Sequence, residues 1–300
     1  MARDVKGASE WWPHRLDVLC RAGLDLDTEG GGIMKIGVVG CAGRMGRNLI
    51  QQVVAAKGAG AELAAVCDRP GYAGVGQDAG ALAGLESLGI KVSEQASAVF
   101  AASDVVIDFT TPEATERHLM LAVDYKKALV VGTTGLAAAF SARLEEAGCQ
   151  IPIVAAPNMS LGVNLLLGLV EKVAKALDES FDIEVLEMHH RHKVDAPSGT
   201  ALALGRAAAR GRGVELSETA VRSRDGITGA RRAGDIGFAT LRGGSVVGDH
   251  TVIFAADDER IEFTHKAGNR SIFARGAVRA ALWCARRPPG LYGMADVLGL

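Results

Sequence analysis

A glycine-rich turn near the start of the chain limits the fold more than any other feature of the sequence. The apolar run 35–39 ends at Gly40, and residues 44–56 carry apolar side chains at helical spacing. Between them Gly40, Gly43 and Gly46 form a G-x-x-G-x-x-G pattern rather than the commoner G-x-G-x-x-G. Glycines allow a tight turn that a pyrophosphate can approach, and the amides at the helix start attract its negative charge. The turn therefore predicts a dinucleotide site, with a glycine turn that binds no ligand as the alternative for this motif alone.

An acidic residue after the next apolar run supports the dinucleotide site. The run 62–67 ends at Asp68, at about the spacing from the glycines at which a carboxylate binds an adenosine ribose. Asp68 alone favours NADH, whereas the guanidinium of Arg69 would pair with the 2'-phosphate of NADPH. A solvated surface charge is the alternative for Arg69. We expect the chain to use NADH or NADPH, and the sequence leaves the preference open.

Strand-like and helix-like segments alternate in the first half of the chain, which predicts a parallel sheet covered on both faces. The second half has a long apolar helix, a strand, another helix and then three consecutive strand-like runs, which predicts an antiparallel sheet. The expected fold is thus α/β, with a Rossmann-type parallel sheet domain and a second α+β domain whose sheet is largely antiparallel. The expected strands are 35–39, 62–67, 105–107, 128–131, 153–155, 181–188, 235–241, 246–256 and 260–264, and the expected helices are 44–56, 112–123, 136–147, 161–177, 198–209 and 271–285.

These patterns also suggest domain boundaries. We expect a dinucleotide-binding domain over 34–157, a substrate-binding and oligomerisation domain over 158–268, and a C-terminal segment 269–300 that returns to the first domain. Residues 1–33 mix tryptophans and charges without a usable period, and they end in a Glu-Gly-Gly-Gly run. We expect residues 1–33 to be a disordered extension or a misassigned start, with Met34 as the true initiator.

Composition excludes several classes of partner. The formal net charge of -2 and a pI near 6.4 give no electrostatic basis for binding nucleic acid or an anionic membrane. The five cysteines are scattered without C-x-x-C spacing, so the sequence predicts neither a metal site nor a disulfide framework. No apolar run is long enough to span a bilayer, and no secretory signal is recognisable. We therefore expect a cytoplasmic protein.

A cluster of basic residues carries the chemistry. Residues 189–193 hold three histidines, one arginine and one lysine, and Ser198-Gly199-Thr200 then begins a predicted helix. Metal binding would need carboxylate or cysteine partners at ligand spacing, and none stand out. A single histidine would more often be packing or surface, but this density favours a cationic pocket that binds an anion and keeps a proton donor at hand.

The motifs together resemble one known family. H-H-R-H-K-V-D-A-P-S-G-T (189–200), with G-C-A-G-R-M-G-R, D-F-T-T-P, G-T-T-G and A-P-N-M-S-L-G-V-N before it, is similar to the dihydrodipicolinate reductases. The resemblance runs from about Met34 to the C-terminus. It implies NADH- or NADPH-dependent reduction of 4-hydroxy-tetrahydrodipicolinate to tetrahydrodipicolinate in the diaminopimelate route to lysine. It also implies a small dicarboxylate substrate and a homotetramer built through the sheet of the second domain.

The resemblance also assigns roles to residues. His189 is expected to donate or accept a proton, Lys193 to donate one, and His190, Gly199 and Thr200 to bind substrate. Met159 departs from many relatives, which carry phenylalanine there, so affinity or preference for the cofactor is expected to differ. The residues expected to contact the cofactor are Gly40, Cys41, Ala42, Gly43, Arg44, Met45, Asp68, Arg69, Gly132, Thr133, Thr134, Ala156, Pro157, Asn158 and Met159.

Three other functions would leave different signatures in the sequence. A different Rossmann-type dehydrogenase would share the glycine turn and Asp68 but would not need the histidine-rich stretch. An acylating semialdehyde dehydrogenase needs a nucleophilic cysteine, and neither Cys149 nor Cys284 has an evident base nearby in sequence. A non-catalytic nicotinamide sensor predicts a damaged catalytic stretch, whereas this one is intact.

Overall fold

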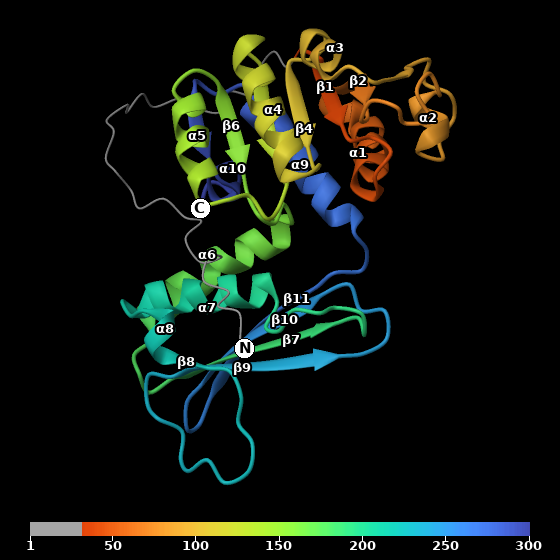
Figure 1. Cartoon of the computed structure of the whole chain (residues 1–300). Coiled ribbons are helices and arrows are strands. Elements are labelled where there is room, and N and C mark those ends of the chain that lie inside the picture. The colour runs from red at the N-terminus through yellow and green to blue at the C-terminus, as the bar shows by residue number, and fades with distance from the viewer. Residues whose placement is uncertain (1–31) are drawn as a thin grey trace, which may run out of the picture. The chain divides into compact units, whose positions relative to one another are not determined.

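The computed structural model describes residues 32–300, which form two compact units (Figure 1). The first unit contains the described residues up to Pro157 together with Ala277–Gly293, and the second contains Asn158–Gly276 and Met294–Leu300. The chain therefore returns to the first unit at Ala277 and to the second at Met294. The expectations for residues 1–31 lie outside the described residues.

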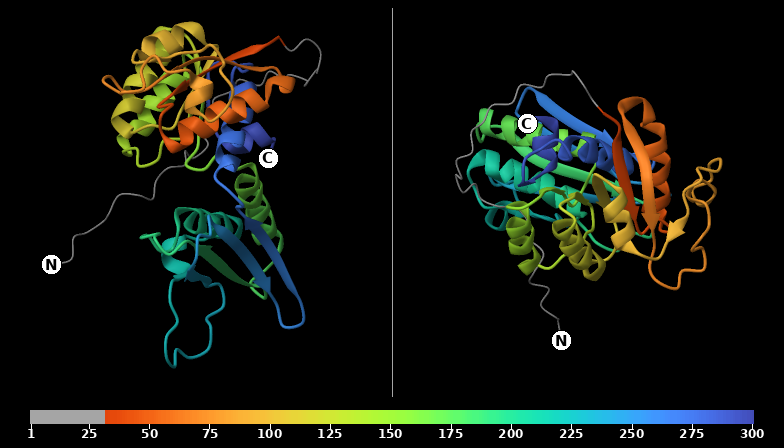
Figure 2. Two further views of the ribbon diagram at one scale, coloured as in Figure 1. Left: turned by 90° about the vertical axis from the view of Figure 1, so that its right-hand side faces the viewer. Right: turned by 90° about the horizontal axis from the view of Figure 1, so that it is seen from above.

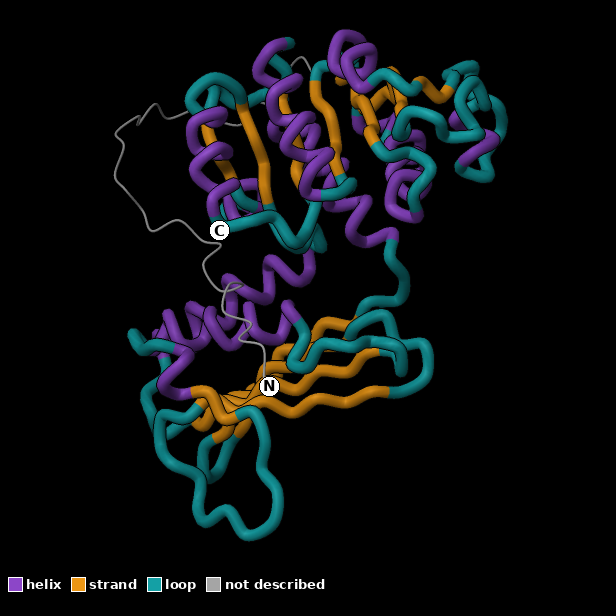
Figure 3. The backbone as a smooth tube through the Cα atoms, viewed as in Figure 1, coloured by secondary structure: helices purple, strands orange, loops and turns teal. Residues whose placement is uncertain are grey.

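A seven-stranded parallel sheet forms the centre of the first unit (Figure 3). Its strand order is β12-β6-β5-β4-β1-β2-β3, so β2 and β3 are added on one side of β1, and β4, β5 and β6 on the other. Open α/β sheets bind their ligands at such a switch point, here between β1 and β4. The strands are β1 (Met34–Val39), β2 (Ala61–Cys67), β3 (Val92–Ser93), β4 (Val105–Asp108), β5 (Ala128–Val131), β6 (Pro152–Ala155) and β12 (Gly290–Tyr292). The helices are α1 (Arg44–Ala55), η1 (Lys57–Ala59), α2 (Ala79–Leu82), α3 (Ala96–Ala102), α4 (Pro112–Asp124) and α5 (Ala139–Gly148), with part of α9 (Ser271–Cys284).

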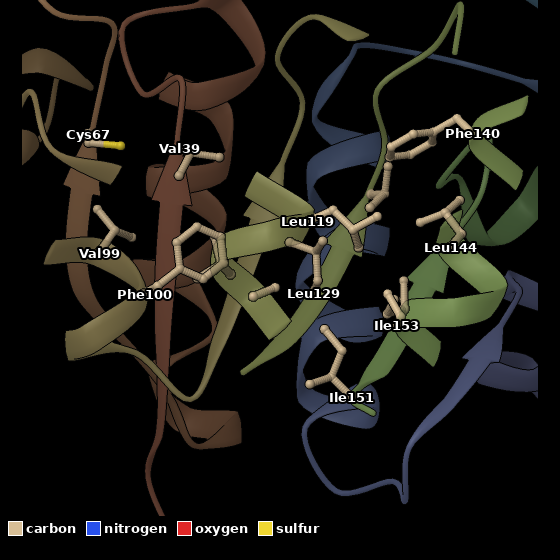
Figure 4. Close-up of a cluster of buried hydrophobic side chains, with 14 residues drawn as sticks. Val39, Cys67, Val99, Phe100, Leu119, Leu129, Phe140, Leu144, Ile151 and Ile153 are labelled. Carbon is tan, nitrogen blue, oxygen red and sulfur yellow. The ribbon is translucent and has the colours of Figure 1, made fainter. Parts of the chain in front are cut away.

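Burial explains why these strands are continuous apolar runs. Every residue of β4 and β5 is buried, as expected for strands covered on both faces. Helices α3, α4 and α5 cover one face with a core that includes Phe100, Leu119 and Phe140 (Figure 4). The parallel sheet predicted from the alternation of strands and helices is thereby confirmed.

Several short elements of this unit leave no recognisable pattern in the sequence. Strand β3 has two residues and β12 has three, so neither shows a measurable alternation of apolar and polar side chains. Helix α3 has seven residues, which is too short for a helical period to stand out. These strands form the two edges of the sheet, and their pairing is decided by contacts distant in sequence.

The second unit is a five-stranded sheet with helices on one face (Figures 1 and 2). Alternate residues of its central strand are buried, and those such as Val185 pack with α6 and α7. Within the described residues no helix covers the opposite face. Its elements are α6 (Leu161–Ala176), β7 (Asp182–His189), α7 (Gly199–Arg212), α8 (Leu216–Thr219), β8 (Ala220–Val221), β9 (Ile236–Arg242), β10 (Asp249–Ala255), β11 (Arg260–Lys266) and α10 (Met294–Leu298), with the start of α9.

The order of strands in this sheet, β11-β10-β7-β9-β8, does not follow the chain. Strand β10 pairs antiparallel with β7 and β11, so the antiparallel sheet is confirmed, while β9 pairs parallel with β7 and β8. Consecutive strands β9 and β10 are not neighbours, because β7 lies between them. The central position of β7 brings the end of that strand, at His189, beside residues of both β9 and β10.

Candidate active site

The glycine turn has the shape that a phosphate site needs. Gly40 has a φ of 69°, in the left-handed region that favours glycine. A Cβ at Gly46 would lie 2.2 Å from the carbonyl oxygen of Gly40, so only glycine fits where α1 begins. No side chain caps α1, and no acidic residue lies in its first turn. The first amides of this helix are thus left to bind an anionic group, which fits the phosphates of a dinucleotide.

Asp68 lies at the end of β2 and fixes this turn. Its carboxylate accepts hydrogen bonds from the backbone N–H of Ala42 at 2.8 Å and from that of Arg69 at 2.9 Å. The side chain of Arg69 is exposed. The structure therefore brings the expected ribose-binding carboxylate next to the expected phosphate-binding turn, with a guanidinium beside it.

The loop at Gly132–Thr134 is held by a carboxylate that the sequence analysis did not single out. Asp108, at the end of β4, is fully buried and pairs with the Nδ1 of His118 at 2.8 Å. The hydroxyls of Thr110 and Thr133 donate to the other oxygen of Asp108 at 2.6 and 3.3 Å. This network joins the loops that follow β4 and β5. The D-F-T-T-P motif was the available signal, but its aspartate could be assigned only once His118 was placed opposite it.

The segment 156–159 connects expected cofactor residues to an expected substrate residue. The side-chain amide of Asn158 donates to the hydroxyl of Thr200 at 3.2 Å. Met159 is buried, with 1% of its surface exposed. Pro157 is exposed and Ala156 is buried. The side chain of Asn158 thus contacts Thr200, a residue expected to bind substrate.

His189 ends β7 and is oriented by the side chain two residues before it. Its Nδ1 lies 2.5 Å from a carboxylate oxygen of Glu187, which is 1% exposed. Arg242, at the end of β9, donates two hydrogen bonds to the same carboxylate, at 2.9 and 3.0 Å. Neither Glu187 nor Arg242 was predicted from the sequence. The available signal was the i, i+2 spacing of Glu187 and His189, which places both on one face of a strand.

A small pocket lies against His189. Its volume is about 50 Å³, and its polar lining includes Asn158, Thr200, His250 and His265. Burial, together with the nearby charge of His189, lowers the pKa of His250 to about 4. Burial also lowers the pKa of His265. These two imidazoles are therefore neutral near pH 7, and each has an Nδ1 without a hydrogen-bond partner in the described chain.

The remaining expected residues lie in the basic stretch and at the start of α7. Lys193 forms an ion pair with Asp195 at 2.6 Å, and its backbone N–H donates to the carbonyl of His190. Partial burial, then the positive charges of Arg270 and neighbouring residues, lower the pKa of His190. Gly199 and Thr200 are the first residues of α7, whose N-cap Ser198 accepts a hydrogen bond from Ala201. The basic stretch thus lies beside a helix start that offers free amides.

Among residues 32–300 no three His, Cys, Asp or Glu side chains are grouped so that they could hold a metal ion. No helix in this part of the chain is both long and apolar enough to cross a membrane.

Comparisons with known proteins match nearly all of the described chain. The family models described as "Dihydrodipicolinate reductase, N-terminus" and "Dihydrodipicolinate reductase, C-terminus" match residues 34–159 and 162–298. The 4-hydroxy-tetrahydrodipicolinate reductase of Rhodopseudomonas palustris (strain BisB18) is 55% identical over 267 residues, which are 89% of this chain and 98% of the relative. The reductase of the same name from Allorhizobium ampelinum is 56% identical over 268 residues, 89% of this chain and 98% of the relative.

Solved structures show a similar fold. A dipicolinate-bound dihydrodipicolinate reductase from Paenisporosarcina sp. TG-14 has a TM-score of 0.69 at 21% identity, with coverage of 88% of this chain and 98% of that one. An amine dehydrogenase from Mycobacterium smegmatis has a TM-score of 0.51 at 13% identity, with coverage of 86% and 94%. At these identities the likeness concerns the fold alone.

Proposed function

The chain belongs to the dihydrodipicolinate reductase family, and on that premise we propose how its residues carry out the reaction. The resemblance seen in the sequence is confirmed by the family models and by the curated relatives. The protein is an oxidoreductase that reduces 4-hydroxy-tetrahydrodipicolinate with a nicotinamide cofactor, in the diaminopimelate route to lysine. The roles of individual residues are our proposal.

The cofactor is proposed to bind along the carboxyl edge of the parallel sheet. The free amides at the start of α1 would hold its phosphates, and Asp68 would hold the adenosine ribose. Arg69 is exposed next to Asp68, which supports use of NADPH as well as NADH. When bound, the nicotinamide supplies the hydride.

The substrate is a small dicarboxylate, and we propose that cations and helix amides hold its carboxylates. Gly199 and Thr200 begin α7, where unpaired N–H groups and the helix dipole favour a negative charge. His190 lies in a cluster whose positive charges lower its pKa, so it would contribute a hydrogen bond rather than a full charge near pH 7. Asn158 orients the hydroxyl of Thr200, because its amide donates to that oxygen.

One observation carries the proposed proton transfer: Glu187 engages the Nδ1 of His189, so the other ring nitrogen is left for the pocket. His189 would there accept or donate a proton at Nε2. Lys193 would donate a proton after release from Asp195, to which it is bound at 2.6 Å. Protonation by a positioned group typically accelerates a reaction about 10²- to 10⁴-fold.

Replacement of His189 and Lys193 tests these roles. We expect His189→Gln to lower kcat by about 10²- to 10⁴-fold with little change in KM, since a transition-state role is removed. Lys193→Ala is expected to lower kcat and raise KM. Oxidation of NADH or NADPH is followed by absorbance, with substrate made in situ from pyruvate and aspartate semialdehyde by the preceding synthase. Lys172→Ala, at an exposed lysine on α6, is the control. Parent-like kinetics in both active-site variants would refute the assignment.

We also propose that the protein is a cytoplasmic homotetramer. No described helix covers one face of the second sheet. This face carries Leu186, Met188 and Ile253, together with Leu241, which is 48% exposed. These apolar side chains, on a face that also carries Glu184, support self-association. The described cysteines are free thiols, in keeping with a reducing compartment. Light scattering tests the assembly: Leu241→Glu should give a smaller particle than the parent, and a monomeric parent would refute the tetramer.

A further inference from the structure

We infer that Glu187 is a positioning residue that sets the tautomer of His189 and fixes the loop and helix around it. The inference rests on the proposed role of His189. Glu187 is the only carboxylate that the described chain places against this imidazole. A carboxylate in this position could also be an ordinary buried ion pair, so its individual contacts decide between the two.

Its five contacts run to four residues, which belong to the site or to the neighbouring strand β9: His189, Ser198, Thr240 and Arg242. One oxygen of Glu187 engages the Nδ1 of His189 and a guanidinium nitrogen of Arg242. The other oxygen accepts from the second guanidinium nitrogen at 3.0 Å, from the backbone N–H of Ser198 at 3.0 Å and from the hydroxyl of Thr240 at 3.4 Å. The carboxylate is therefore fully hydrogen-bonded although its side chain is 1% exposed.

The charge of this carboxylate is retained. Burial alone would raise the pKa of Glu187, but the hydrogen bonds from Arg242, His189 and Ser198 outweigh it, so the pKa lies below its ordinary value. An ionised carboxylate can only accept hydrogen bonds. A neutral His189 must then carry its hydrogen on Nδ1, and its Nε2 is an acceptor.

The free nitrogen has a defined place. A Cβ at Gly248 would lie 2.9 Å from the Nε2 of His189, so this nitrogen lies against the bare backbone of Gly248. His189 and Gly248 both line the pocket that contains Thr200. When His189 takes up a proton at Nε2, the adjacent anion of Glu187 stabilises the imidazolium.

The same carboxylate ties down the two neighbouring elements. Through the N–H of Ser198 it holds the N-cap of α7, where Gly199 and Thr200 are proposed to bind the substrate. Arg242 also donates to the backbone carbonyl of Asp195 at 2.6 Å, and Asp195 holds Lys193. One buried anion thus links the imidazole, the helix start and the lysine loop.

Glutamine at this position makes a distinct prediction. If its NH₂ faced Ser198, it would meet a backbone N–H that cannot change from donor to acceptor. If it faced His189, the imidazole could move its hydrogen to Nε2 and accept at Nδ1. Each orientation also sets the NH₂ beside one guanidinium nitrogen of Arg242, so that contact does not decide between them. We therefore expect Glu187→Gln to change His189 from the Nδ1–H to the Nε2–H tautomer, which reverses the hydrogen-bonding role of the nitrogen in the pocket.

The matched control lies on the same strand. Glu184 likewise accepts hydrogen bonds from guanidinium groups, those of Arg224 and Arg231, but the alternation of β7 turns it to the opposite face. Glu184→Gln is the same chemical change on the same strand, outside the site. It should leave both the His189 tautomer and kcat at the values of the parent.

The experiment combines ¹⁵N NMR of histidine-labelled protein with steady-state kinetics. The chain has seven histidines, and the His189 signals are assigned by their loss in His189→Gln. Glu187→Gln should convert His189 to the Nε2–H tautomer and lower kcat by at least about tenfold with a smaller change in KM. In the His189→Gln background, Glu187→Gln should cause little further loss, since the two residues act as a unit.

An unchanged tautomer in Glu187→Gln would overturn the inference, and so would an unchanged kcat where His189→Gln itself is impaired. If His189→Gln were as active as the parent while Glu187→Gln still changed the tautomer, the proposed role of His189 would fail and the orientation by Glu187 would stand. If Glu187→Gln does not fold, Glu187→Asp is measured in the same way. It keeps the charge opposite Arg242 and withdraws the carboxylate from His189, so loss of the Nδ1–H tautomer is again expected and its retention would overturn the inference.

Discussion

Replacement of Gly46 by alanine should damage both the fold and the cofactor site of the first unit. A Cβ at this position would lie 2.2 Å from the carbonyl oxygen of Gly40 and 2.6 Å from the Cα of Cys41. Both are backbone atoms of the glycine turn, so the turn itself must open. Forced overpacking of this kind costs about 1–3 kcal/mol. We therefore expect Tm to fall by roughly 2–10 °C.

The same displacement moves the amides that are proposed to hold the cofactor phosphates. A further cost of about 1–3 kcal/mol in the bound state would weaken binding by about 5- to 150-fold. Fluorescence titration with NADH and NADPH measures the affinity, and thermal unfolding measures Tm.

Two other glycines serve as comparisons for Gly46→Ala. Gly43→Ala places its Cβ no closer than 3.3 Å to the protein, so it should spare Tm even if the methyl group obstructs the cofactor. Gly58→Ala meets nothing within 4 Å and should change neither quantity. A Gly46→Ala variant with the parent's Tm and cofactor affinity would refute the reasoning.

Three more predictions follow from the site. Gly248→Ala puts a methyl group 2.9 Å from the Nε2 of His189. Because this displaces the imidazole, kcat should fall by up to about 100-fold, and an unchanged kcat would contradict the prediction. His118→Leu leaves the buried carboxylate of Asp108 without its imidazole partner. The free energy of unfolding in urea should fall by about 2 kcal/mol, and equal urea midpoints of variant and parent would count against the prediction. Since burial lowers the pKa of His250 to about 4, protonation favours the unfolded chain: the contribution of His250 is complete above pH 6.5 and falls by roughly 3 kcal/mol as the pH drops to 4. His250→Gln should weaken this acid sensitivity, and equal pH slopes would contradict the prediction.

The sequence predicted those elements whose side chains repeat a clear period. Strand β5 and the start of α1 lie where the pattern placed them, because a strand buried on both faces and an uninterrupted amphipathic helix are both local signals. The position of β7 between β9 and β10 was not predictable in this way. Strand neighbours depend on packing between segments distant in sequence, which no local pattern records.

The residues of the candidate site also fall into those with a local signal in the sequence and those without one. His189 and Lys193 could be found because the basic cluster is contiguous, and Asp68 because its distance from the glycine turn is characteristic. Glu187 and Asp108 were missed because their importance depends on partners far along the chain, Arg242 in one case and Thr133 in the other. A buried carboxylate is recognised by the donors around it, and those are brought together only by folding.

The discontinuous first unit has a consequence for synthesis of the protein. The edge strand β12 pairs with β6 and belongs to residues 277–293, whereas the rest of the unit's strands are made before residue 157. A nascent chain on the ribosome therefore carries the exposed edge of β6 while the whole of 158–276 is being translated. Unpaired strand edges are templates for aggregation, so the partly made chain is the form most in need of a chaperone. A stop codon before residue 290 would make that exposed edge permanent.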